Sequence, residues 1–313
     1  MTINITLHSF SLVQHFQYKN GFDVFSFIEL ADRLKFSGVS LSLVGANYRH
    51  LGSKDTDHME RVCAAIADHS LSLDVETAGT KPSHLKQLIS VAKQLRSPSL
   101  RTFTHHSGSK NQMIARTIAD LAQVVEEAAS AGVVLLLENH EDFTGLEMIE
   151  IVQAVNHPSL KILFDYGNSQ MLLEDPEAAL EAMLPHIYSV HVKDHALVEA
   201  KNSEVGWVIG VPVGDGTLPI QSLTNTLLAH GIKRFSFENS WAYKAPIRSG
   251  EEPKGEVVLG QNSFRWVAPP FDDRSLCIEP GALDPNTLVE YEYSALLRGW
   301  ESFKTMVANL DLG

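Results

Sequence analysis

The chain alternates short apolar runs with longer segments whose apolar residues recur at helical spacing. Eight of the runs have the length and composition of β-strands. They cover residues 3–8, 38–44, 71–76, 100–105, 133–138, 161–165, 188–193 and 234–238. The run Val133–Glu138 is apolar up to its last residue. Such a continuous run is typical of a strand in a parallel sheet that is covered on both faces.

Amphipathic segments between these runs predict helices. In Phe25–Phe36 the apolar residues fall on one stripe at a spacing near 3.6 residues. We predict helices over 25–36, 57–68, 84–95, 112–131, 146–155, 176–184, 219–230 and 289–310. Asp175 before Pro176 is typical of a helix start, and Gly132 and Gly231 are typical of the position just beyond a helix end.

Eight strands alternating with about eight helices predict an α/β fold. A (β/α)8 barrel is favoured over a doubly wound open sheet, because no G-x-G-x-x-G follows the first strand. Barrels of roughly 250 residues form one domain, so we expect a single TIM-barrel domain over residues 1–313. Two segments exceed the repeat: 196–217 after strand seven, expected as an irregular loop or hairpin, and the long loop 240–286 after strand eight. Both follow the strand ends at which barrels build active sites.

The net charge limits the expected partners. The chain has 25 Lys and Arg against 38 Asp and Glu, a formal charge of −13. Nucleic-acid binders usually carry a basic excess, so we expect no nucleic acid. We also expect no membrane partner, because the sequence has no apolar run of 18 residues and no signal-peptide pattern at its start. Cys63 and Cys277 fit no paired motif, so a cytoplasmic location is the default expectation.

Ionisable residues stand at the carboxyl ends of the last four predicted strands. Strands five and six end in Glu138 and Asp165, strand seven contains His191, and strand eight ends in Glu238. Three carboxylates and an imidazole at one barrel mouth repel one another unless a positive charge lies among them. A divalent cation supplies that charge. The oxygen-rich donor set with one nitrogen suits Mn²⁺ first, and also Mg²⁺, Co²⁺ or Zn²⁺.

Four strand-end motifs together resemble the xylose-isomerase-like TIM-barrel superfamily, which contains sugar (phosphate) isomerases and epimerases. They are Leu137-Glu138-Asn139-His140, Asp165-x-Gly167-Asn168, His191-Val192-Lys193-Asp194 and Glu238. The resemblance covers nearly the whole chain and is specific as a set. It implies that four residues bind the metal: Glu138, Asp165, His191 and Glu238. It also implies that Glu138 and Glu238 act as the acid/base pair on opposite faces of a bound ketose.

The sequence departs from the epimerase pattern at two positions. Many ketose epimerases have a histidine where this chain has Asn168, and several have an arginine where it has Leu197. The superfamily also contains dehydratases and decarboxylases of oxo sugar acids such as 3-oxo-isoapionate. We therefore expect a metal-dependent enzyme that acts on a small keto sugar or sugar acid through a metal-bound enediolate. An isomerase or epimerase is the first expectation, and a decarboxylase or dehydratase is the alternative.

Further residues at or near the strand ends are candidate substrate contacts. They are His8, Glu76, His105, His140, Asn168, Lys193 and Trp241. Each has a plain structural alternative, such as a hydrogen-bonded core histidine, a turn asparagine or a packed tryptophan. The expected partner is a small sugar or sugar acid, and a homodimer or homotetramer is compatible with this function.

Two other classes of function remain open. An abasic-site endonuclease shares this barrel, but it would need several histidine-bound zinc ions and a basic groove. A non-catalytic sugar-binding barrel would have lost a ligand residue, whereas all four positions are filled here.

Overall fold

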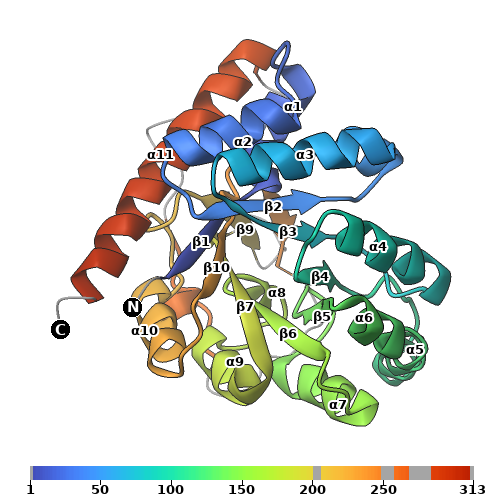
Figure 1. Cartoon of the computed structure of the whole chain (residues 1–313). Coiled ribbons are helices and arrows are strands. Elements are labelled where there is room, and N and C mark those ends of the chain that lie inside the picture. The colour runs from blue at the N-terminus through green and yellow to red at the C-terminus, as the bar shows by residue number, and fades with distance from the viewer. Residues whose placement is uncertain (1–2, 200–205, 248–256, 268–282, 311–313) are drawn as a thin grey trace.

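The computed structural model describes residues 3–199, 206–247, 257–267 and 283–310. Eight parallel strands close into a barrel with the order β1-β10-β7-β6-β5-β4-β3-β2 (Figure 1). The barrel strands are β1 (Asn4–His8), β2 (Gly38–Ser42), β3 (Ser72–Glu76), β4 (Ser99–Thr102), β5 (Val134–Glu138), β6 (Leu160–Asp165), β7 (Ile187–Val192) and β10 (Arg234–Phe237). This closed sheet confirms the predicted (β/α)8 TIM barrel.

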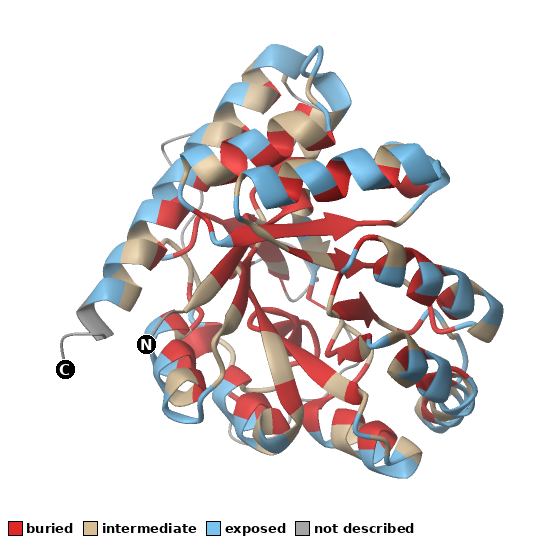
Figure 2. Ribbon diagram, viewed as in Figure 1, coloured by how far each residue is buried: buried red, intermediate tan, exposed pale blue. Residues whose placement is uncertain are grey.

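Helices surround the barrel and bury their apolar faces against it, as the alternation of buried and exposed turns in Figure 2 shows. They are α2 (Val24–Arg33), α3 (Thr56–Asp68), α4 (Pro82–Gln94), α5 (Lys110–Ala122), α6 (Val125–Ala131), α7 (Gly145–Val155), α9 (Pro176–Met183), α10 (Ile220–Ala229) and α11 (Pro285–Leu310). The short helices α1 (Val13–Tyr18) and α8 (Asn168–Met171) were not predicted. In the described ranges, no helix has the length and apolar character needed to cross a membrane.

Several predicted boundaries were wrong. The helix predicted over 112–131 is two helices, because the backbone leaves helical geometry at Val124 (φ −126°) while the apolar pattern continues. The strand predicted over 100–105 ends at Thr102, and the apolar Phe103 beyond it lines a pocket instead. The last helix starts at Pro285 rather than at Val289, so the loop expected to end at residue 286 is shorter. Asp284 caps this helix by accepting hydrogen bonds from its first backbone N–H groups.

A second, antiparallel sheet of three strands stands apart from the barrel. It consists of β8 (Asp194–Glu199), β9 (Gly206–Val211) and β11 (Lys244–Pro246). Strands β8 and β9 form a hairpin that occupies much of 196–217, while β11 lies in the segment 240–286. Residues 200–205, 248–256 and 268–282 of these two segments lie outside the described residues. Residues Trp241 and Tyr243, just before β11, and His195 on β8 line the pocket described below.

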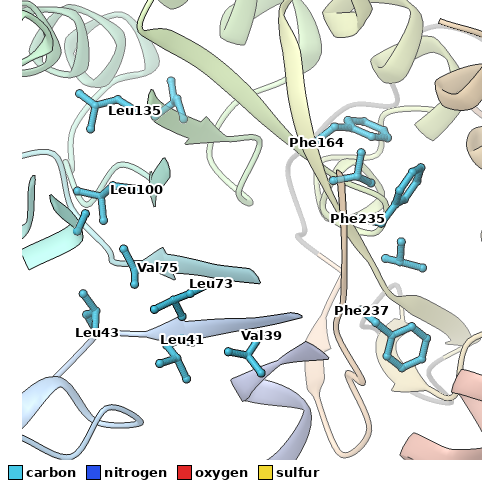
Figure 3. Packing of buried hydrophobic residues seen from close by; sticks show 14 of the residues in the cluster. Val39, Leu41, Leu43, Leu73, Val75, Leu100, Leu135, Phe164, Phe235 and Phe237 are labelled. Carbon is cyan, nitrogen blue, oxygen red and sulfur yellow. The ribbon is translucent and has the colours of Figure 1, made fainter. Parts of the chain in front are cut away.

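The strands direct apolar side chains outward and polar side chains inward. Val39, Leu41 and Leu73 belong to the apolar cluster between strands and helices (Figure 3). The alternate residues point into the barrel, because side chains of a strand alternate between its faces. There Asp74 and Arg234 form an ion pair of 2.7 Å beside a small cavity of about 20 Å³. This polar layer lies in the barrel interior, below the carboxyl ends of the strands.

Candidate active site

The four predicted ligand residues meet at the carboxyl ends of their strands. His191 Nδ1 lies 3.2 Å from Glu138 Oε1, 3.7 Å from Asp165 Oδ2 and 3.5 Å from Glu238 Oε2. His191, Glu138 and Asp165 are buried, whereas the Glu238 side chain is 17% exposed. The structure therefore brings together all four residues, with Glu238 on the solvent side.

Three of these residues fit a divalent cation. Ligand atoms of Glu138, Asp165 and His191 lie within 4.8 Å of one another. Glu138 Oε2, Asp165 Oδ2 and His191 Nδ1 are buried and make no hydrogen bond of regular geometry among the described residues, although Arg101 Nη2 and Lys193 Nζ each form a 3.0 Å ion pair with one of the two carboxylate oxygens. Buried polar atoms of folded proteins are normally hydrogen-bonded. Two carboxylate oxygens and one imidazole nitrogen at this spacing are a donor set for Mn²⁺, Mg²⁺, Co²⁺ or Zn²⁺.

Glu76 lies behind His191 and orients its ring. Glu76 Oε1 is 2.8 Å from His191 Nε2 and accepts a hydrogen bond of 2.5 Å from Ser40 Oγ. On the other side, His8 Nδ1 accepts from the backbone N–H of Phe10. The hydrogen of His8 is thereby placed on Nε2, which donates to Glu76 Oε2 at 2.8 Å. With its Nε2 hydrogen held by Glu76, His191 presents Nδ1 to the cluster, as metal-binding histidines do.

Glu76 and His8 were expected as substrate contacts, but the structure places both away from the pocket. Neither residue lines the pocket, and both are buried beneath His191. Burial raises the pKa of Glu76, but the neighbouring His191, His8 and Arg101 outweigh it and hold that pKa well below its usual range. An ionised Glu76 with its oxygens occupied supports the His191 ring and does not line the pocket.

Arg101 on β4 is a site residue that the sequence interpretation missed. Its Nη2 lies 3.0 Å from Glu138 Oε2, its Nε lies 3.3 Å from Glu76 Oε2, and its Nη1 donates to the Thr77 carbonyl at 3.1 Å. Burial raises the pKa of Glu138, but Arg101 and His191 outweigh it and lower that pKa. The signal was present in the sequence, since an arginine inside an apolar strand needs a buried partner.

Asp165 is fixed by its neighbours. Its Oδ1 accepts hydrogen bonds from the N–H groups of Gly167 and Asn168, and the Asn139 side chain exchanges two hydrogen bonds with its backbone. Lys193 Nζ lies 3.0 Å from Asp165 Oδ2 and donates to Asn168 Oδ1 at 2.9 Å. Burial raises the pKa of Asp165, but Lys193 and His191 outweigh it and lower that pKa. Asp165 is therefore an ionised carboxylate held in one orientation.

An open pocket of about 420 Å³ lies over this cluster. Among the predicted substrate contacts, five line it: His105, His140, Asn168, Lys193 and Trp241. Lining residues that were not predicted as contacts include Phe10, Arg101, Phe103, Glu141, His195, Tyr243 and Glu292. The His140 ring stacks on Phe103 with centroids 3.8 Å apart. Glu138 and Glu238 also face this pocket, so a ligand in it reaches the cluster.

A TIM barrel with a cluster of acidic residues and a histidine at the carboxyl ends of its strands is the class of protein to which this structure belongs. Residues 10–256 match the xylose isomerase-like TIM barrel family, and the chain belongs to this family.

The chain is also similar to curated proteins and to solved structures. The chain is 25% identical over 224 residues to the uncharacterized protein YihM of Escherichia coli, covering 70% of this chain and 68% of that protein. It is 26% identical over 173 residues to a 3-oxo-isoapionate decarboxylase of Pectobacterium atrosepticum, covering 54% of this chain and 61% of the relative. A D-psicose 3-epimerase structure from Clostridium cellulolyticum has a TM-score of 0.61 at 15% identity, covering 95% of this chain and 98% of the other. At that identity the likeness shows the fold alone.

Proposed function

We propose that this chain is a divalent-metal-dependent enzyme that acts on a small keto sugar or sugar acid. The observation that carries the proposal is the group of three buried ligand atoms of Glu138, Asp165 and His191, which lie within 4.8 Å of one another beneath the pocket that Glu138 lines. A divalent ion held by Glu138, Asp165 and His191 would polarise a substrate carbonyl and would stabilise negative charge on its oxygen. The protein's own residues then supply orientation and proton transfer.

Glu238 is the proposed proton-transfer group. Its carboxylate lines the pocket and is the most exposed member of the cluster. Glu138 has a different environment, because the buried Arg101 lies against it at 3.0 Å. A carboxylate whose pKa is lowered by such a partner is a weak base. We therefore assign Glu138 to holding the metal and Glu238 to moving the proton. Lys193, which also lines the pocket, is placed to donate to a substrate oxygen.

One proton-transfer group is sufficient for a decarboxylation. Loss of CO₂ from an oxo acid leaves an electron pair on the neighbouring carbon; Glu238 in its protonated form delivers the proton that this carbon takes up and then regains a proton from solvent. The pairing of Arg101 with Glu138 therefore favours decarboxylation of an oxo sugar acid, and the similarity to the 3-oxo-isoapionate decarboxylase supports the same reaction. A dehydratase would instead remove a proton from the carbon next to the carbonyl and then lose a hydroxyl group as water.

An isomerase or epimerase is the second candidate. Glu138 and Glu238 lie 3.2 and 3.5 Å from the same nitrogen of His191, so two carboxylates do face one site. This arrangement favours removal of a proton by one group and its return by the other.

Incubation with Mn²⁺ in D₂O separates these reactions. We expect CO₂ release from an oxo sugar acid, with one deuterium in the product and no deuterium entering ketoses. If deuterium instead enters a ketose and an epimeric product forms, the enzyme is an epimerase and the proposed decarboxylation is wrong. Glu238→Ala should reduce kcat by roughly 10²–10⁴-fold while Mn²⁺ stays bound through the other three residues. Full activity in this variant, beside a Glu150→Gln surface control, would refute the assigned role.

A further inference from the structure

One wall of the pocket contains buried polar atoms without partners. Asn168 Oδ1 accepts a hydrogen bond from Lys193 Nζ, so the amide Nδ2 is directed elsewhere and has no partner among the described residues. Both ring nitrogens of His195 also lack a hydrogen bond of regular geometry there, and the ring lies against the Gly167 backbone. Asn168 is 2% exposed and His195 is 1% exposed. Buried groups of this kind each cost about 1–3 kcal/mol when they stay unpaired, so the fold alone gives no reason for them.

These atoms lie at one place in the pocket. A Cβ atom added to Gly167 would lie 2.5 Å from His195 Cε1 and 3.0 Å from Lys193 Cε. The missing side chain of Gly167 thus lets His195 and Lys193 pack directly on the backbone beside Asn168. All three side chains line the pocket.

His195 is held rigidly although its ring makes no hydrogen bond of regular geometry within the described residues. The carboxylate of Asp194 accepts hydrogen bonds from the backbone N–H of His195 and from three N–H groups of the loop 214–218. The N–H of Thr217 donates to the His195 carbonyl at 2.7 Å. The ring is stacked on Tyr243, with centroids 5.7 Å apart and an angle of 18° between the rings. A ring fixed in this way is preorganised for a ligand.

The charged groups around this wall are already matched. Arg101 lies against Glu76 and Glu138, and Lys193 lies against Asp165. Among the lining residues that the structure describes, no lysine or arginine is left without a carboxylate. Glutamates 141, 238 and 292 also line the pocket. A phosphate group in this pocket would share it with these carboxylates, and no lysine or arginine among the described lining residues is left to balance its charge.

A neutral hydroxyl matches the free atoms. Burial and the nearby Lys193 charge lower the pKa of His195 to about 3. The neutral ring offers one N–H and one lone pair, and the Asn168 amide offers N–H groups. A hydroxyl both donates and accepts, whereas a phosphate or carboxylate oxygen only accepts.

We propose that Asn168 and His195 form a hydroxyl-binding subsite, which selects a substrate whose polyol end is uncharged and carries no phosphate. This inference rests on the proposed function, because it assigns a substrate class to the same pocket. It also gives the inserted hairpin a role, since His195 lies on β8 and not on a barrel strand.

The test uses binding and unfolding rather than turnover. The variant His195→Phe keeps a ring against Tyr243 and removes both nitrogens. His50→Phe is the matched control, because His50 is equally buried, stacks on Phe16 and hydrogen-bonds Ser9 Oγ at 2.7 Å. In the ligand-free protein we expect the Tm of His195→Phe to equal or exceed that of the wild type, and the Tm of His50→Phe to fall.

Binding is measured by calorimetry in the presence of Mn²⁺ with two matched pairs of probes. These are D-fructose and D-gluconate, each compared with its phosphate monoester. We expect the free compound of at least one pair to bind roughly tenfold more tightly than its ester, and His195→Phe to weaken that binding roughly tenfold.

Three results would overturn the inference: tighter binding of the esters, binding of neither free compound, or a His195→Phe variant that loses Tm like the control and keeps its affinity. The proposed function fails separately, by absence of Mn²⁺-dependent turnover of any keto sugar or oxo acid.

Discussion

Replacing Glu76 by glutamine tests the orientation of His191. The carboxylate accepts on both sides, from His191 Nε2 on one oxygen and from His8 Nε2 on the other, at 2.8 Å each. A glutamine amide has one accepting oxygen and one NH₂ group, so one histidine must face a donor. The Phe10 N–H holds His8 Nδ1 as an acceptor, so His8 cannot move its hydrogen without losing that bond.

The amide nitrogen of the introduced glutamine is therefore expected to face a histidine N–H in either orientation. When it faces His191, the ring hydrogen is driven to Nδ1, where it occupies the lone pair that points at Glu138 and Asp165. Loss of such a supporting partner lowers metal affinity by roughly 10–100-fold, which corresponds to about 1.4–2.7 kcal/mol. We expect a loss in this range for Mn²⁺ in Glu76→Gln.

The assay is Mn²⁺ titration followed by calorimetry, together with ¹⁵N NMR of the His191 ring in a Mg²⁺ or Zn²⁺ complex. Asp74→Asn is the matched control. Asp74 lies on the same strand two residues earlier, is paired with Arg234 at 2.7 Å and accepts a hydrogen bond from Ser99. This variant should lose stability and keep its Mn²⁺ affinity. Unchanged affinity in Glu76→Gln, or an equal loss in Asp74→Asn, would refute the reasoning.

Two further predictions concern charge. Arg101→Met leaves Glu76 and Glu138 without the arginine that they share, so the free energy of unfolding measured by denaturant titration should fall by roughly 3–5 kcal/mol. Mn²⁺ should restore part of this loss. An unchanged denaturation midpoint would contradict the prediction. In the metal-free protein, burial lowers the pKa of His191, but Glu76, Asp165 and Glu138 outweigh it and raise that pKa well above its usual value. The associated stability is complete below pH 6.5, the usual pKa of histidine, and is lost as pH rises through the raised pKa. Mn²⁺ binding displaces this proton, so Mn²⁺ affinity should increase with pH, with proton release detectable by calorimetry in buffers of different ionisation enthalpy. A pH-independent affinity would show that His191 is not a ligand.

The strand-end residues of the site were predictable because they obey a rule along the chain. Parallel barrel strands end at one face, so Glu138 and Asp165 at the ends of two apolar runs had to lie near each other. His191 and Glu238 join them because the strands that carry these two residues belong to the same eight-stranded barrel, which the sequence predicted. Small errors at the boundaries, such as the end of β4 at Thr102, did not change which face these residues reach.

Arg101 and His195 were missed for different reasons. Arg101 was hidden inside a run that was interpreted only as a strand, and its partners Glu76 and Glu138 lie on the two neighbouring strands. His195 belongs to a hairpin whose position over the barrel follows from contacts with the loop 214–218 and with Tyr243. Neither contact leaves a periodic signal in the sequence.

The sequence by itself determined the barrel, the face that carries the site and the acid-and-histidine set, since strand length and alternation fix where each strand ends. Only the tertiary structure decided which side chains face the pocket. His191 and Glu76 are 115 residues apart and meet through ring closure of the barrel. That contact places Glu76 and His8 behind the metal-binding candidates, while the hairpin brings His195 to the front. The role of each residue depends on neighbours from distant strands, which a pattern along one chain does not encode.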